Sequence, residues 1–415
     1  MKMKSILLSL LLALLVGCLP IRPAPSPVVS VTPDPSGESS ALSENLTVGC
    51  VENYDPTIDY FPHKATLAYA SAWTVEYHNN YKVVTLLTPW NAATETFQYV
   101  LVQCGTPPPT AYPNAPVFEV PIRTIITMSS TQLPHLVKLN RLDSLVGHTD
   151  FATVNTPEVR ALIDAGKLVE VGSGPQVNIE MVIETEPNLI MPFGLGNPEQ
   201  DAHPKLMEAG LPVAINAEYM ETTPLGRVEW LKYMALFFNE EARGNAAFSE
   251  IANRYNAMAA IARNVAEKPT AFTGIPRGDT WYMTGGNSYF ARFLADAGAR
   301  HLWADTDSTG TVPLSFEAVY DQAREGQFWF NTSSWATLAD TVATDARLAD
   351  FTAYQTGHIY NNNARLNASG GNDYWEGGLA NPDVVLADLI KILHPELLPE
   401  HELQYYHQLK PSSGS

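Results

Sequence analysis

Hydroxyl, amide and aromatic side chains recur in short loops that directly follow predicted strands. Such groups can hold a small ligand by hydrogen bonding and stacking, and a paired glycine lets the backbone approach that ligand closely. In an open parallel sheet the loops at the carboxyl ends of the strands border one crevice. A capped loop or a buried turn is the alternative at each single position. We expect ligand contacts from Ser129, Ser130, Thr131, Asp150, Phe151, Phe193, Gly194, Trp281, Tyr282, Gly286, Asn287, Tyr289, Asn362, Asn363 and Arg365.

The sequence offers little for metal binding or catalysis. Its ten histidines are scattered and none stands in a His-Glu-x-x-His pattern, so we expect no metal site and no cofactor of its own. A Gly-x-Ser-x-Gly elbow, a P-loop and a Gly-x-Gly-x-x-Gly fingerprint are all missing from the sequence. Asp305 with Asp307, or Asp373 with Glu376, could serve as a carboxylate pair for glycoside cleavage. An anchored carbohydrate-active or other hydrolytic lipoprotein is therefore the alternative to a binding protein.

The N-terminal residues predict export and lipid anchoring. Lys2 and Lys4 precede an apolar run, and Leu15-Val16-Gly17-Cys18 has the layout of a lipobox, with Cys18 as the lipidated residue. An uncleaved anchor or a plain secretory signal is the alternative. Residues 1–17 are then the signal peptide, and the Pro-rich residues 18–44 are a disordered tether at the outer face of the membrane.

Charge and cysteine content fit that location. The chain has a net charge of −19, and removal of two lysines with residues 1–17 would leave 23 basic against 44 acidic residues. Such a surface disfavours nucleic acid and anionic lipid headgroups, so we expect contact with the membrane through the lipid anchor only. Cys50 and Cys104 are the other cysteines, and in an oxidising compartment we expect them to form a disulfide rather than remain as buried thiols.

The order of predicted elements indicates an α/β protein with two lobes, each a mostly parallel sheet flanked by helices. We assign residues 45–222 to the first lobe, which includes an additional β-hairpin at 81–87 and 97–103, and residues 269–410 to the second lobe. Predicted first-lobe strands are 123–128, 145–147, 188–191 and 212–215, with helices at 156–165 and 199–209; the second lobe repeats the alternation from 270 to its last helix at 382–393.

Residues 223–268 interrupt the alternation and predict a helical connector. Phe248, Ile251, Tyr255, Met258 and Ile261 recur every three or four residues, which gives one apolar helix face. At roughly 1.5 Å per residue, a helix over 241–266 would exceed 30 Å, the length of a strut between two lobes.

The chain resembles the substrate-binding lipoproteins of ABC importers for iron complexes and cobalamin, which have the class III periplasmic-binding-protein fold with one long rigid helix between the lobes. The resemblance covers roughly residues 119–410. The residues that carry it are Thr127-Met128-Ser129-Ser130, Pro187-Asn188-Leu189-Ile190, Pro224-Leu225-Gly226-Arg227-Val228-Glu229-Trp230, Asp296-Ala297-Gly298-Ala299, Gly370-Gly371-Asn372-Asp373-Tyr374-Trp375-Glu376 and Pro382-Asp383.

The resemblance implies a monomer that holds an iron chelate or a corrinoid between its lobes and delivers it to a membrane permease with its ATPase subunits. It also implies that one acidic residue on each lobe docks onto the permease. By position these residues are Glu199 and Glu317, each expected in the first turn of a helix. Stabilisation of the helix dipole, worth about 0.3–1 kcal/mol, is the alternative role.

Overall fold

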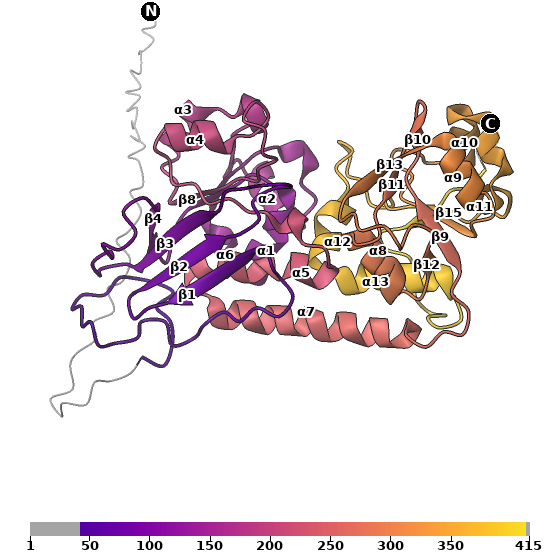
Figure 1. The fold of residues 1–415 in the computed structure, drawn as a ribbon. Coiled ribbons are helices and arrows are strands. Elements are labelled where there is room, and N and C mark those ends of the chain that lie inside the picture. Colours follow the sequence, from indigo (N-terminus) through magenta and orange to yellow (C-terminus); the bar gives the residue numbers. More distant parts are fainter. Residues whose placement is uncertain (1–41, 412–415) are drawn as a thin grey trace, which may run out of the picture.

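The computed structural model describes residues 42–411 (Figure 1). The predicted signal peptide, the predicted lipidation site Cys18 and the predicted tether as far as residue 41 lie outside the described residues. Within residues 42–411, no helix combines the length and the apolar character that crossing a bilayer would require.

The central sheet of the first lobe is parallel, with strand order β7-β6-β5-β8. The inner strand β5 and the strand β8 are buried on both faces because helices cover them, as the apolar runs predicted, whereas Glu170 of the edge strand β7 is exposed. The predicted strand at 212–215 makes only an isolated bridge, between Ile190 and Val213. The elements are β5 (Ile125–Thr127), α1 (Leu133–Lys138), β6 (Leu145–His148), α2 (Pro157–Asp164), β7 (Val169–Glu170), α3 (Ile179–Glu184), β8 (Leu189–Met191) and α4 (His203–Glu208).

A second sheet precedes this core and comprises β1 (Trp73–Tyr77), β2 (Tyr81–Leu86), β3 (Phe97–Gln103) and β4 (Val117–Val120). The antiparallel pairing of β2 with β3 confirms the predicted hairpin, while β4 adds to β3 in parallel. Cys50 and Cys104 form the predicted disulfide. Apolar side chains of this sheet join the first-lobe core, so the added sheet is packed onto that lobe rather than separate from it.

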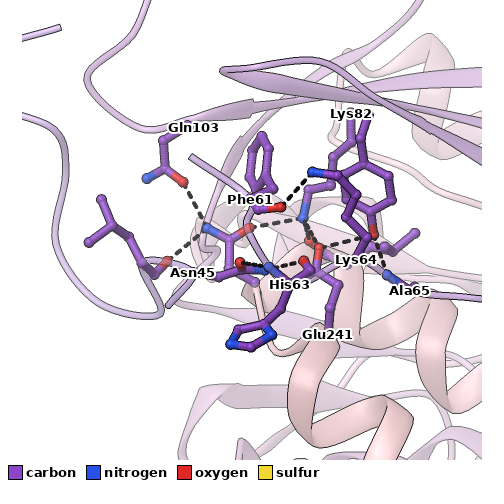
Figure 2. A network of polar contacts seen from close by, with 12 residues as sticks. Asn45, Phe61, His63, Lys64, Ala65, Lys82, Gln103 and Glu241 are labelled. Carbon is purple, nitrogen blue, oxygen red and sulfur yellow. Dashed lines mark hydrogen bonds and ion pairs between the residues drawn. The ribbon is translucent and has the colours of Figure 1, made fainter. Parts of the chain in front are cut away.

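A buried ion pair fastens the added sheet to the connector. The Lys82 ammonium on β2 donates to the Glu241 carboxylate at 2.6 Å, the Leu236 carbonyl at 2.6 Å and Asn239 Oδ1 at 2.9 Å (Figure 2). Both charged side chains are inaccessible to solvent. A buried charge is tolerated only when hydrogen bonds and an opposite charge satisfy it. These contacts therefore fix the position of β2 relative to the start of the connecting helix.

The second lobe contains a sheet of order β12-β9-β14-β15-β16, parallel except for β16, and a small antiparallel sheet β10-β11-β13. The strands are β9 (Thr270–Thr273), β10 (Pro276–Arg277), β11 (Thr280–Thr284), β12 (Arg300–His301), β13 (Thr311–Ser315), β14 (Phe328–Phe330), β15 (Ile359–Asn361) and β16 (His407–Gln408). The helices are α8 (Tyr289–Asp296), α9 (Phe316–Ala323), α10 (Leu338–Thr344), α11 (Thr352–Gln355), α12 (Gly377–Ala380) and α13 (Pro382–Leu393).

Three helices form the connecting region: α5 (Pro224–Val228), α6 (Trp230–Phe238) and α7 (Glu241–Ala262). Every residue of α6 is buried, and this helix belongs to the first-lobe core, whereas α5 contributes to the second-lobe core. Only α7 runs along both lobes, packed on α6 and α13 (Figure 1). The left-handed Asn239, with φ of 57°, separates α6 from α7. The two lobes are therefore joined by one long helix of 22 residues.

Candidate functional site

A cavity of about 480 Å³ opens at the carboxyl ends of β9 and β14 in the second lobe. We call it the cleft cavity. Tyr282 and Trp375 present aromatic rings there, and their residues are 47% and 48% exposed. Large aromatic side chains this exposed offer stacking surface to a ligand. The lining residues are Gly274, Ile275, Arg277, Tyr282, Thr311, Asn331, Ser333 and Trp375.

Strand alternation decides which of two neighbouring aromatics on β11 reaches this cavity. Successive side chains of a strand point to opposite faces. Tyr282 faces outward, whereas Trp281 is fully buried and its indole Nε1 donates to the Thr273 carbonyl at 2.8 Å. We expected Trp281 to contact the ligand, but it belongs to the core.

Buried polar side chains hold the loop after β14, which contributes Asn331 and Ser333 to the cleft cavity. The Asn361 amide donates to the carbonyls of Ser333 and Trp335 at 2.8 and 2.9 Å. Tyr406 donates its hydroxyl proton to Asn331 Oδ1 at 3.0 Å. This wall of the cleft cavity is therefore preformed.

The first lobe has a smaller cavity, about 20 Å³, at the carboxyl ends of its own strands. Met128, Thr149, Pro192 and Phe193 are among its lining residues, and Phe193 is 42% exposed. The buried Asp201 carboxylate orders the loop beyond Phe193 by accepting the backbone N–H groups of Leu195, Gly196 and Asn197.

Ser129, Ser130 and Thr131 lie half-buried just after β5, where the sequence predicted them, and the Ser129 and Thr131 hydroxyls are 2.9 Å apart. Below them, Thr127 Oγ1 lies 2.8 Å from His148 Nδ1. Burial lowers the pKa of His148 to about 4, so this imidazole is neutral near pH 7. The loop after β5 therefore presents hydroxyl groups next to a neutral histidine.

The two lobes touch through a set of hydrogen bonds that we call the lobe latch. The buried Glu376 carboxylate of the second lobe accepts the backbone N–H groups of Asn155 and Thr156, each at 2.7 Å, and the Thr156 hydroxyl. The Asn367 amide donates to the Ala152 and Val154 carbonyls at 2.9 and 3.0 Å. Since Trp375 precedes Glu376, the latch also fixes one aromatic wall of the cleft cavity.

Several predicted ligand residues instead make contacts within the protein. A side chain at Gly194 would come within 2.9 Å of the Trp90 ring, and one at Gly286 within 2.3 Å of the Ala304 carbonyl. These glycines permit close chain packing. Asn362 is 7% exposed, and its neighbour Asn363 bonds His407 at 2.6 Å.

The remaining predicted residues also make contacts within the protein. Asp150 accepts the Ala152 N–H at 2.9 Å, while Phe151 packs against the first-lobe core. Arg365 pairs with Asp373 at 2.9 Å. The exposed Asn287 donates to the Asp307 carbonyl at 3.4 Å, and the Tyr289 ring lies 4.6 Å from the Arg227 guanidinium. None of these side chains lines either cavity among residues 42–411.

The two acidic residues expected at helix starts differ in position. Glu317 lies in the first turn of α9, as predicted, and its side chain is exposed. Glu199 is exposed too, but α4 begins at His203, so Glu199 lies in the preceding turn and not in a helix. The helix starts late because the Asp201 side chain binds the loop backbone before it.

Sequence reasoning missed Arg277, Thr311, Asn331, Ser333 and Trp375. Trp375 had a usable signal, since it is an aromatic residue in a glycine-rich loop, as Tyr282 is near Gly285 and Gly286. The other four carry no local pattern. Arg277 and Thr311 are brought together by the pairing of β10, β11 and β13, whereas Asn331 and Ser333 follow β14 of the other second-lobe sheet.

Neither carboxylate pair offers an arrangement for hydrolysis. Glu376 is occupied by the lobe latch, and Asp373 is paired with Arg365. Asp305 and Asp307 are exposed and line neither cavity. Across residues 42–411, no three His, Cys, Asp or Glu residues come together in a group that could hold a metal ion.

Comparison with known proteins identifies relatives by sequence and a solved structure of similar fold. An uncharacterised lipoprotein of Methanocaldococcus jannaschii is 26% identical over 300 residues, which are 71% of this chain and 70% of the relative. A cobalamin-binding protein of Halobacterium salinarum is 24% identical over 242 residues, 57% of this chain and 62% of that protein. A periplasmic heme-binding protein from Pseudomonas aeruginosa has a similar fold, with a TM-score of 0.51 at 20% identity, covering 71% of this chain and 100% of the other.

The family model described as "Periplasmic binding protein" matches residues 125–366, more than half of the chain. The match begins at β5 in the first lobe and reaches past β15 in the second, so it includes the central strands of both lobes. A match of this length to a family of binding proteins, which are not enzymes, removes the hydrolytic alternative. The chain therefore belongs to the periplasmic binding protein family, whose members bind solutes and are not enzymes.

Proposed function

We propose that this protein captures an iron chelate, a haem-like tetrapyrrole or a corrinoid between its lobes and delivers it to the permease of an ABC importer. The cleft cavity carries the proposal, because it is large and lined by exposed aromatic side chains at the carboxyl ends of parallel strands. The names of two relatives, a cobalamin-binding and a heme-binding protein, support this class of ligand.

The lining of the cleft cavity favours a ligand with a flat apolar body and an anionic group. Tyr282 and Trp375 supply surface for stacking. Arg277 is the only charged side chain among the lining residues within 42–411, and it is exposed. Asn331, Ser333 and Thr311 offer hydrogen bonds to polar substituents.

Titration of the full chain with haemin, cyanocobalamin and a ferric hydroxamate siderophore tests the proposal through the quenching of tryptophan fluorescence. We expect saturable binding of at least one compound. Tyr282→Ala and Trp375→Ala should each weaken it tenfold or more, because each removes roughly 1.5–3 kcal/mol of apolar burial. Tyr54→Ala, a change at a partly exposed tyrosine outside the cleft cavity, is the matched control. Failure of all three compounds to bind would refute this ligand class.

Delivery to a permease uses Glu199 and Glu317 in this proposal. Charge reversal, Glu199→Lys with Glu317→Lys, should abolish uptake by cells and leave ligand affinity unchanged. The exposed pair Glu184→Lys with Glu400→Lys is the control for added positive charge. Loss of ligand affinity in the first variant would contradict a docking role.

We further propose that lipidation of Cys18 anchors the protein at the outer face of the cell membrane, after removal of residues 1–17. The lipoprotein name of one relative supports this anchor. The unmodified chain should incorporate radiolabelled palmitate when it is expressed in a bacterial host, and Cys18→Ala should not. Equal labelling of the two chains would count against the anchor.

A further inference from the structure

A second large cavity, about 350 Å³, lies beside α7 and shares no lining residue with the cleft cavity. We call it the α7–α8 cavity. Part of its wall comes from Tyr69 and α5, and the rest comes from α7, from Lys268 beyond it and from α8. It therefore joins the segment before β1 to the second lobe.

Positive charge dominates this cavity, although the whole chain has a net charge of −19. Arg263, Lys268 and Arg292 line it, against one carboxylate, Asp296. Arg292 Nε already binds Asp296 at 2.8 Å. Within residues 42–411, neither Arg263 nor Lys268 has a carboxylate at ion-pair distance. The cavity thus has an excess of two positive charges, and a concave surface of one sign concentrates counter-ions.

The donor groups suit an oxyanion. Asp296 Oδ2 also accepts the Tyr255 hydroxyl at 2.8 Å, so this carboxylate is held against Arg292 and away from the other two cations. Because Arg292 uses its Nε for Asp296, its terminal N–H groups remain available as donors. Asn256 Nδ2 donates to the Tyr69 hydroxyl at 3.3 Å, which leaves the hydroxyl proton of Tyr69 free to donate.

Tyr69 is itself fixed, since the buried Glu229 carboxylate accepts its backbone N–H at 2.7 Å. A ligand in the cavity would therefore contact a stationary part of the first half of the chain and α8 of the second lobe at once. Such contacts would restrain the two parts relative to each other.

We propose that the α7–α8 cavity binds a phosphate group between Arg263, Lys268 and Arg292, and that bound phosphate stabilises the junction of the two lobes. A doubly charged phosphate matches the excess of two positive charges. The phosphate can come from a free solute or from the headgroup of an anionic phospholipid in the membrane to which the tether leads. Both sources present non-bridging phosphate oxygens to the same donors, although a phosphodiester headgroup carries one negative charge and free phosphate carries two.

Titration calorimetry of the full chain with inorganic phosphate, at ionic strength held constant with sodium chloride, tests the site. We expect saturable binding and a rise in the thermal unfolding temperature, because a ligand that binds only the folded state stabilises it. Arg263→Gln with Lys268→Gln should lose at least tenfold in affinity. Arg123→Gln with Lys167→Gln removes the same charge from exposed first-lobe positions and should bind as the unmodified chain does.

A second arm distinguishes the two sources of phosphate. The chain is sedimented with vesicles of phosphatidylglycerol or of phosphatidylcholine, with and without inorganic phosphate. Binding to phosphatidylglycerol that phosphate displaces supports a headgroup as the ligand, whereas phosphate binding alone supports a free solute.

Equal phosphate affinities of the two double variants would refute the proposed site. An equal rise in the thermal unfolding temperature with sodium chloride alone would refute it too. Arg263→Lys with Lys268→Arg keeps both charges and should restore most of the binding, which separates loss of charge from loss of folding. The phosphate site can be tested separately from the proposed function. Tyr282 lines the cleft cavity and not the α7–α8 cavity, so Tyr282→Ala should leave phosphate binding unchanged.

Discussion

Replacement of Glu376 by alanine should open the lobe latch without unfolding either lobe. The change leaves the backbone N–H groups of Asn155 and Thr156 and the Thr156 hydroxyl without their acceptor. An unsatisfied buried donor costs about 1–3 kcal/mol. Asn155 is half-buried and can bind water, whereas Thr156 is buried, so we expect a total near 2–4 kcal/mol.

Amide hydrogen exchange measures this cost directly. At about 1.4 kcal/mol per factor of ten, exchange of the Asn155 and Thr156 amides should accelerate roughly 30- to 700-fold. Amides of β5, in the first-lobe core, should keep their protection. Glu402→Ala, which removes an exposed carboxylate of the C-terminal segment, is the control. Unchanged exchange at residues 155 and 156, or equal acceleration in β5, would refute the reasoning.

Three further perturbations have signs that follow from the structure. Replacing Cys50 and Cys104 by serine should lower the free energy of unfolding by about 4 kcal/mol, the chain-entropy value for this loop; an unchanged denaturation midpoint would contradict it. Lys82→Met should cost about 3–5 kcal/mol in the same assay because it leaves the buried Glu241 carboxylate without its counter-charge, and adding Glu241→Leu should recover part of the loss. Burial raises the pKa of Glu376 above its ordinary value near 4.5, so the folded state binds this proton more tightly. The stability that this proton contributes is therefore full below pH 4.5 and is lost as pH rises through the raised pKa, and Glu376→Gln should remove this part of the pH profile of unfolding.

Local patterns predicted most elements because their causes are local. The final helix runs from Pro382 to Leu393 as expected, since proline at its first position and one apolar face define it within a dozen residues. The start of α4 was wrong by four residues. The Asp201 carboxylate accepts three N–H groups of the preceding loop. The first residue of α4 therefore depends on these contacts rather than on helix propensity.

The site was harder to predict than the fold because adjacent residues of similar type differ in whether they reach the cavity. Trp281 and Tyr282 are adjacent aromatics, and only the register of β11 against β13 determines that Tyr282 is exposed. Gly194 has the composition of a ligand loop, yet Trp90, over a hundred residues earlier, occupies the space beside it. Such long-range packing leaves no trace in a local pattern.

The stiffness of the molecule has a source beyond the long helix α7. The buried Glu229 carboxylate lies between α5 and α6 and accepts the backbone N–H groups of Ala68, Tyr69 and Ala70. Because α5 packs in the second-lobe core and α6 in the first, Glu229 marks the joint between the lobes, and the segment before β1 is bonded across it. With α7 along both lobes and the lobe latch on Glu376, the lobes are held at three separate places. Large hinge motions would break buried charged hydrogen bonds, so we expect recognition to depend on a preformed cleft with small side-chain adjustments.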